Sequence, residues 1–215
     1  MTKWLKWCCG GCLVALVLAA LAGVFVWRWV EDLPREWTSE AQIEISAPVS
    51  EVLPLVADLR RWKEWSAWNR DSHEDVERRF LGPEQGAGTR MEWESEESAG
   101  SGWLELRGVG ASGVEYESLH FGALVLAGHE ERSSARRSIS VVLREFDHDY
   151  AVPGSISVEA TERGSRVTWR ESIDLGDSPV AKFFSIVTLE SIARNAHRKL
   201  LETSLEGLKD RAELR

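Results

Sequence analysis

Three side chains that could transfer a proton fall on predicted strands of this sequence. Tyr116 and His120 lie on the same side of a strand predicted over 114–121, because side chains separated by an even number of residues share a face. Glu171 follows Val167 and Trp169 in alternation on another predicted strand. Proton transfer needs a positioned acid or base whose pKa is shifted towards neutrality by burial. Tyr116, His120 and Glu171 are therefore candidate catalytic residues, and a solvated or paired side chain is the alternative for each.

The other polar groups in the sequence predict no second reactive site. His129, His148 and His197 are expected at the surface, and the group Asp147-His148-Asp149 lacks the spaced additional ligands of a metal site. The sequence contains no phosphate-binding glycine loop, nucleophile elbow or diagnostic pair of carboxylates. All 3 cysteines precede the folded part, which excludes a disulfide framework or a thiolate nucleophile there. We predict no metal and no cofactor.

Charge and length limit the partners and the number of domains. The 215 residues suit one domain of ordinary size with an appendage. The formal net charge of -9 is the opposite of the basic footprint that a phosphate backbone requires. We therefore expect no nucleic-acid partner, while the sequence leaves the oligomeric state open.

An uncharged stretch near the N-terminus predicts a membrane anchor. No charged residue lies between Trp7 and Trp27, and about 20 apolar residues at about 1.5 Å rise each span a hydrocarbon core. Tryptophans flank both ends, where indole rings prefer the headgroup layer. We predict a single transmembrane helix within residues 1–30. A cleaved signal peptide, with a small-x-small site at Ala20-Leu21-Ala22, is the alternative.

The basic residues before the apolar stretch predict its orientation. Lys3 and Lys6 favour a cytoplasmic N-terminus. The protein is then expected to be a single-pass membrane protein whose domain lies in the periplasm or outside the cell. Residues 31–40 are charged and contain Pro34, so they are predicted to be a polar linker.

Alternating apolar residues predict that most of the domain is an antiparallel sheet. The expected strands cover residues 41–47, 89–95, 102–109, 114–121, 155–161 and 166–173. A first helix should end near Leu59, and apolar residues at helical spacing over 179–213 predict a long terminal helix that lies across the sheet. The segment 122–152, with a strand-like run at 137–146, is expected to be an inserted hairpin or flap. Trp62, Trp65 and Trp68, at intervals of three, are expected to close one end of the core, and a ligand-facing role for one of them is the alternative.

Local landmarks in this order of elements resemble a known family. Ile45-Ser46-Ala47-Pro48 and Asp58-Leu59-Arg60-Arg61-Trp62 resemble the opening of SRPBCC proteins, the START-related polyketide cyclase/dehydrase group. Gly86-Ala87-Gly88-Thr89, Gly164-Ser165-Arg166-Val167-Thr168-Trp169 and Leu205-Glu206-Gly207-Leu208-Lys209 are similar to its later landmarks. The resemblance covers residues 41–210. It implies an α+β helix-grip domain, in which a curved antiparallel sheet wraps around a long C-terminal helix and encloses an elongated apolar cavity.

The resemblance implies binding more directly than catalysis. The first hypothesis is a membrane-anchored domain that binds a lipid, an isoprenoid or a polyketide-like molecule between the sheet and the terminal helix. The residues expected to line this cavity are Met91, Trp93, Leu104, Leu106, Val158, Trp169, Phe183 and Val187. One alternative is a cyclase or dehydrase that uses Tyr116, His120 or Glu171. Another is a protein-interaction domain whose cavity is filled by its own side chains.

Overall fold

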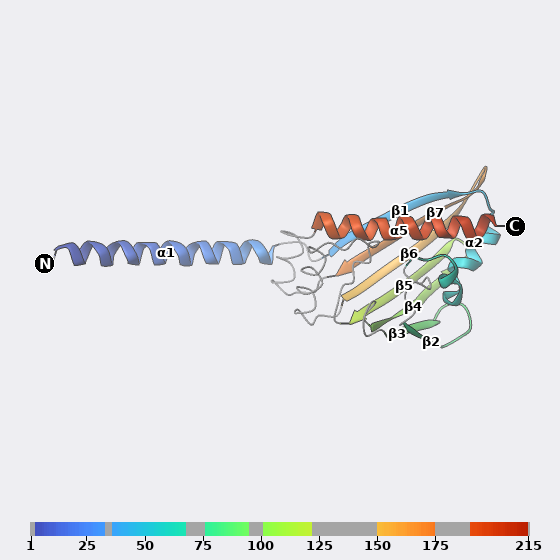
Figure 1. The fold of residues 1–215 in the computed structure, drawn as a ribbon, viewed down its shortest axis with the longest axis horizontal. Coiled ribbons are helices and arrows are strands. Elements are labelled where there is room, and N and C mark those ends of the chain that lie inside the picture. The colour runs from blue at the N-terminus through green and yellow to red at the C-terminus, as the bar shows by residue number, and fades with distance from the viewer. Residues whose placement is uncertain are drawn as a thin grey trace.

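The computed structural model describes residues 3–32, 36–67, 76–94, 101–121, 150–174 and 190–214 (Figure 1). Its helices are α1 (Lys3–Glu31), α2 (Val49–Val56), the 3-10 helix η1 (Leu59–Glu64) and α5 (Glu190–Glu213). Its strands are β1 (Glu36–Ile45), β2 (Glu77–Leu81), β3 (Arg90–Glu94), β4 (Ser101–Gly110), β5 (Gly113–Phe121), β6 (Tyr150–Thr161) and β7 (Gly164–Asp174).

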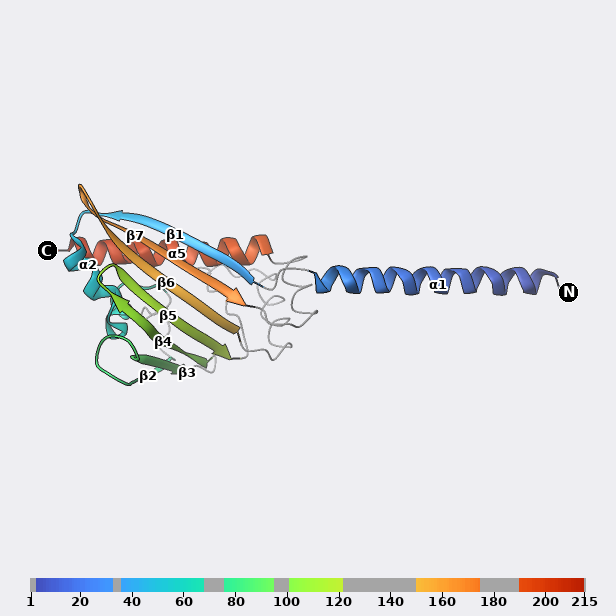
Figure 2. The same ribbon diagram turned by 180° about the vertical axis from the view of Figure 1, so that it is seen from behind.

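The described strands form one seven-stranded sheet in the order β1-β7-β6-β5-β4-β3-β2. Each pair of neighbours is antiparallel, and β1 pairs with β7 along its whole length. The helix α5 crosses one face of this sheet, and the view from behind shows the strands in front of it (Figure 2). The first and last strands are therefore neighbours, and α5 packs most extensively against β1.

The alternation of apolar side chains along the strands places the core between the sheet and α5. Along β1 the buried positions alternate with exposed ones, as expected of a sheet with one packed face. The helix contributes a buried stripe with roughly helical spacing, made of Leu201, Ser204, Leu205, Leu208 and Ala212. Burial of these side chains is the main favourable free energy of the fold.

Trp62 in η1 and Trp65 directly after it close the core at the end of α2. The indole nitrogen of Trp62 donates to the Val56 carbonyl at 2.9 Å, and that of Trp65 donates to the Leu55 carbonyl at 3.0 Å. These carbonyls belong to the last turn of α2, where no intrahelical donor is available. The Trp62 ring also packs against Trp169, with centroids 5.7 Å apart. The expectation that Trp62 and Trp65 close one end of the core is confirmed, and Trp68 lies outside the described residues.

The predicted antiparallel sheet and terminal helix are confirmed, with differences at their ends. The first strand begins at Glu36, inside the predicted linker 31–40, because Trp37 and Ser39 are buried and continue the alternation. The first helix ends at Val56, and the chain then forms η1. Residues 122–149, which contain most of the predicted flap, and residues 175–189, which contain the predicted start of the terminal helix, lie outside the described residues.

The predicted membrane anchor is wrong. Within the described part of the chain, no helix has both the length and the apolar character needed to cross a membrane. The transmembrane helix within 1–30, the membrane as a partner, and the placement of the domain in the periplasm or outside the cell are all corrected by this finding.

Replacing Trp62 tests the closure of the core. Trp62→Phe removes the donor to the Val56 carbonyl and leaves a void, so the free energy of unfolding should fall by about 2 kcal/mol. Trp103→Phe is the matched control, because that indole packs beneath the Arg90 guanidinium at the edge of solvent and its loss should cost less than about 1 kcal/mol. Urea denaturation measures both. Equal losses in the two variants would contradict this account.

Candidate functional site

A row of core-facing residues crosses the sheet from β1 to β5. Ser39 on β1 pairs with Glu171 on β7, Glu171 pairs with Gly154 on β6, and Gly154 pairs with Tyr116 on β5. The antiparallel register therefore brings Tyr116 and Glu171, which are far apart in the sequence, to the same level of the sheet with one glycine between them. Two of the three candidate catalytic residues meet here.

The missing side chain of Gly154 gives Tyr116 its path to Glu171. A Cβ atom at position 154 would lie 2.1 Å from Cζ of Tyr116, a distance that no pair of carbon atoms tolerates without displacement. The phenol ring can therefore lie across β6 and reach the carboxylate of β7. The same arrangement recurs at Gly102, where a Cβ would lie 2.4 Å from the Trp93 ring.

Glu171 accepts hydrogen bonds on both carboxylate oxygens. The Tyr116 hydroxyl donates to Oε1, and Nε2 of His197 lies 2.6 Å from Oε2. The indole nitrogen of Trp169 donates to the Tyr116 oxygen at 2.6 Å. Together these contacts join one residue of β5, two of β7 and one of α5. The chain of donors ends at the carboxylate, as expected if Glu171 carries the negative charge.

The electrostatics of the row keep Glu171 ionised and Tyr116 neutral. Burial alone would raise the pKa of Glu171, but the hydrogen bonds from His197 and Tyr116 and the nearby imidazoles outweigh it and hold that pKa below its ordinary value. Burial and the adjacent negative charge raise the pKa of Tyr116 well above its usual range. The phenol is therefore a hydrogen-bond donor and the carboxylate is an acceptor over the neutral pH range.

His120, the third candidate, lies beyond the row on β5. Its ring contacts that of Trp93 edge to face, with centroids 5.0 Å apart, and its Nε2 lies 3.4 Å from the Ser118 hydroxyl. Burial lowers the pKa of His120 to about 4, with the Glu171 charge opposing that shift and His197 adding to it. His120 is therefore a neutral imidazole at neutral pH and is coupled to Glu171 by charge.

His197 was predicted to lie at the surface, and this prediction is wrong. Its side chain is only 10% exposed, and its ring meets the edge of Trp37 with centroids 5.3 Å apart. The spacing of His197 could have indicated its burial, because it lies four residues before Leu201 and continues the buried stripe of α5. Of the other histidines expected at the surface, His129 and His148 lie outside the described residues, as do Asp147 and Asp149.

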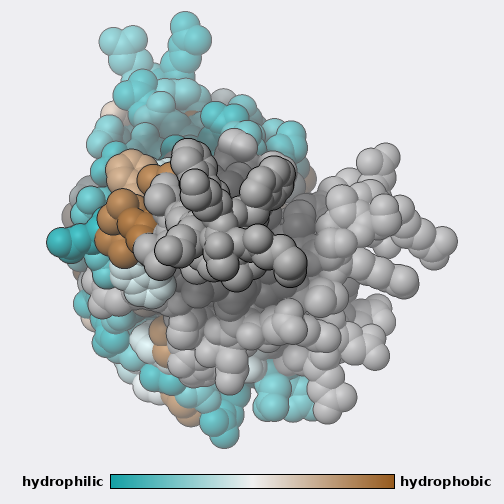
Figure 3. Space-filling model, turned by 90° about the vertical axis from the view of Figure 1, so that its left-hand side faces the viewer, coloured by the Kyte–Doolittle hydropathy of each residue, from teal (hydrophilic) through white to brown (hydrophobic). Residues whose placement is uncertain are grey.

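A second apolar layer lies on the far side of the polar row. Trp37, Ile173 and Val152 occupy the next core-facing positions along β1, β7 and β6, and each exposes 6% or less of its surface. None of the three belongs to the main hydrophobic cluster of buried residues. We call these three residues the outer apolar row. Seen from the α1 end, the coloured surface is mostly hydrophilic with a few small hydrophobic patches (Figure 3).

The predicted cavity-lining residues divide between the packed core and the undescribed segments. Six of them are at most 4% exposed and belong to the main hydrophobic cluster: Met91, Trp93, Leu104, Leu106, Val158 and Trp169. Phe183 and Val187 lie outside the described residues. A role for these eight residues in ligand binding stays a prediction.

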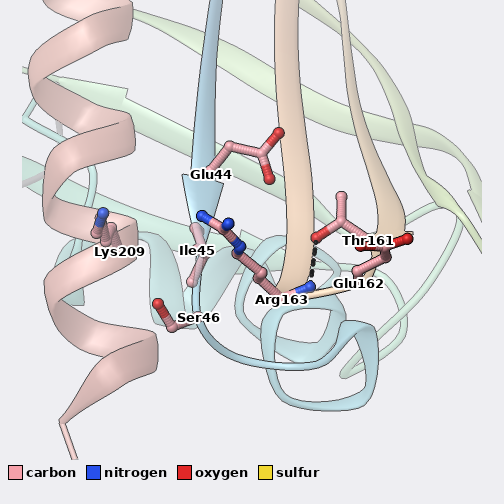
Figure 4. A pocket seen from close by; sticks show the side chains of 7 residues that line it. All are labelled: Glu44, Ile45, Ser46, Thr161, Glu162, Arg163 and Lys209. Atoms are coloured by element: carbon pink, nitrogen blue, oxygen red, sulfur yellow. Dashed lines mark hydrogen bonds between the residues drawn. The ribbon is translucent and has the colours of Figure 1, made fainter.

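One pocket within the described residues lies at the opposite end of β1. It has a volume of about 450 Å³ and is lined by Glu44, Ile45, Ser46, Thr161, Glu162, Arg163 and Lys209 (Figure 4). Six of its seven lining residues are polar or charged, and the Arg163 amide donates to the Thr161 hydroxyl at 3.4 Å. This pocket is remote from the polar row and does not have the character of an apolar cavity. Over the described ranges, no group of three His, Cys, Asp or Glu side chains could hold a metal ion.

Comparisons with known proteins identify the fold. No family model matches the sequence and no curated protein matches it either, but solved structures do. An uncharacterised protein from Rhizobium leguminosarum is similar over 84% of this chain and 96% of its own, with 10% identity and a TM-score of 0.53. The di-domain ARO/CYC BexL of the BE-7585A biosynthetic pathway is similar over 99% of this chain and 60% of its own, with 15% identity and a TM-score of 0.53. The chain has a helix-grip fold. This fold agrees with the resemblance to SRPBCC proteins, and at such identities the similarity concerns the fold alone.

The glycine beneath Tyr116 gives a direct test of the polar row. Gly154→Ala places a methyl group against the phenol ring, so the free energy of unfolding should fall by about 1–3 kcal/mol. Gly108→Ala is the matched control in the same sheet, because the nearest atom to a Cβ there is Oε2 of Glu115 at 3.6 Å, and the change should stay within about 0.5 kcal/mol. Urea denaturation measures both variants. A Gly154→Ala protein as stable as the control would refute the close approach of Tyr116.

The low pKa of His120 predicts a dependence of stability on pH. In the unfolded chain His120 binds a proton below pH 6.5, whereas the folded chain resists protonation to about pH 4. The unfolded state therefore binds more protons in this window, and the free energy of unfolding should fall by up to about 3 kcal/mol as the pH drops from 6.5 to 4. Glu171 affects the free energy of unfolding in a lower pH range, because a lowered carboxyl pKa changes that free energy only below the ordinary carboxyl value of 4.5.

His120→Gln should remove that dependence, because glutamine does not titrate. Denaturation curves recorded between pH 7 and pH 4 would show a flatter profile for the variant than for the natural chain. Parallel profiles would show that the folded protein does not hold His120 neutral.

Proposed function

We propose that this chain binds a small hydrophobic molecule between α5 and the sheet, against the outer apolar row of Trp37, Ile173 and Val152. The observation that carries the proposal is the separation of this row from the main hydrophobic cluster by a layer of polar side chains. A single continuous core would have no reason to place an ionised carboxylate between two apolar layers. The fold supports the proposal, because helix-grip domains enclose space between the sheet and the terminal helix.

The main cluster itself is an unsuitable place for a ligand. The rings of Trp62, Trp65, Tyr116 and Trp169 meet there with centroids 5.2–5.7 Å apart, which is the spacing of directly packed aromatic side chains. Binding at that level would require these rings to separate. The ligand is therefore assigned to the level of the outer apolar row.

The ligand class follows from the lining. Apolar walls select lipids, isoprenoids or polyketide-like molecules, and one structural neighbour is a di-domain ARO/CYC of a biosynthetic pathway. Burying about 200 Å² of apolar ligand surface contributes about 5 kcal/mol at about 25 cal/mol per Å². A larger ligand of the same class would bind more tightly.

Binding of naphthalene to the full chain tests this proposal. Equilibrium dialysis should show saturable binding to the natural protein, and Val152→Trp should weaken it at least about tenfold by placing a large ring in the proposed site. Val109→Trp is the matched control, because Val109 is 39% exposed near the other end of β4 and its replacement should leave the affinity unchanged. Circular dichroism verifies the fold of both variants.

Two outcomes would contradict the proposal. The first is a natural chain that binds no naphthalene and carries no hydrophobic molecule through purification in native mass spectrometry. Such a result would favour a protein-interaction domain with a filled interior. The second is equal affinity in the Val152→Trp and Val109→Trp variants, which would place the binding site elsewhere.

A further inference from the structure

Two buried polar atoms beside Glu171 lack partners within the described part of the chain. Nδ1 of His197 and Oγ of Ser39 are both shielded from solvent and make no hydrogen bond to any described residue. The His197 side chain is nine-tenths buried, and Ser39 is 2% exposed. Leaving a buried polar group unpaired costs about 1–3 kcal/mol, so native structures rarely contain two of them in one place without a reason.

The positions of these two atoms point to the same region. Ser39 lies directly beside Glu171 in the register of β1 and β7, and it shares a face with Trp37. His197 contacts both Glu171 and Trp37 from α5. The unpaired groups therefore border the outer apolar row from the sheet and from the helix.

The bond between His197 and Glu171 determines what Nδ1 can recognise. Because ionised Glu171 can only accept, the hydrogen on Nε2 of His197 is committed to the carboxylate. Nδ1 then accepts a hydrogen bond if the imidazole is neutral and donates one if it is protonated. A hydroxyl group suits both states, since it can donate and accept. A ligand carboxylate at Nδ1 would be repelled by the negative charge of Glu171, which is bonded to the other nitrogen of the same imidazole ring.

We propose that Nδ1 of His197 and Oγ of Ser39 form a polar subsite for a ligand hydroxyl, so that the molecule bound against the outer apolar row is a hydroxylated aromatic, such as a phenol. The aromatic part of the ligand is proposed because Trp37, which contacts the imidazole edge to face, supplies an aromatic side chain for it to pack against. This inference rests on the proposed binding of a hydrophobic molecule and adds the polar group that orients it.

A matched pair of probes tests the subsite in the full chain. 1-Naphthol and naphthalene differ by one hydroxyl, and equilibrium dialysis at pH 7 should show about tenfold tighter binding of 1-naphthol to the natural protein. His197→Phe should remove this preference while retaining naphthalene binding. Lys199→Phe introduces the same side chain at an exposed position of α5 and should keep the preference. Ser39→Ala should reduce it by a smaller factor.

A second measurement needs no variant. In the natural chain labelled with ¹⁵N-histidine, the Nδ1 resonance of His197 should move on addition of 1-naphthol and stay in place on addition of naphthalene. This readout keeps the inference testable if His197→Phe does not fold.

The outcomes separate this inference from the proposed function. Equal affinity for the two probes, or an Nδ1 resonance that does not respond to 1-naphthol, would overturn the subsite and leave the apolar site standing. Such a result would indicate that an internal water satisfies Nδ1. Failure of both probes to bind would overturn the apolar site and the subsite together.

Discussion

The burial of one carboxylate is the constraint on which the arrangement of this domain depends. An ionised Glu171 inside the sheet would cost several kcal/mol if it lacked partners. The phenol of Tyr116 and the imidazole of His197 supply them, one from β5 and one from α5. The position of α5 over the sheet and the path of the Tyr116 side chain across β6 therefore both provide hydrogen bonds to the Glu171 carboxylate. Removing either partner would leave a buried charge only half satisfied.

The layers of the domain follow from this constraint. The aromatic cluster around Trp62 and Trp169 fills the space on one side of the carboxylate, and the outer apolar row lies on the other. The polar row between them is narrow, because each strand contributes one residue to it. A ligand bound as proposed would meet apolar side chains and the polar row, which is the combination typical of sites that select for both shape and one functional group.

Much of the fold was predictable from the sequence, whereas the site was only partly so. The strands were visible because one face is packed and the other solvated, which produces a period of two. Tyr116 and Glu171 could each be placed on the core face from that period, yet their meeting depends on the register of three strands, and register is not encoded in any single strand. Gly154 gave no local signal, because its importance arises from the neighbour that lies over it.

His197 and the N-terminal helix show two different limits of pattern-based reasoning. The terminal helix was predicted from the spacing of its apolar residues, but His197 was expected at the surface. The spacing of His197 to Leu201 predicts its burial better, because a continuous apolar stripe along a helix determines which face is buried more strongly than the type of one residue in it. The N-terminal stretch was judged by composition over 1–30, and the described helix does not meet the requirement for a span.

Side chains in the C-terminal half of α5 bond to the segment between β1 and β2. Ser204, Arg211 and Glu213 bond to Ala67, Glu64 and Ser46, all in the C-terminal half. In the other half, the contact of His197 with Glu171 spans from helix to sheet. Through these bonds the last described helix holds the stretch of chain that leads out of β1, so release of one end of the domain would loosen the other.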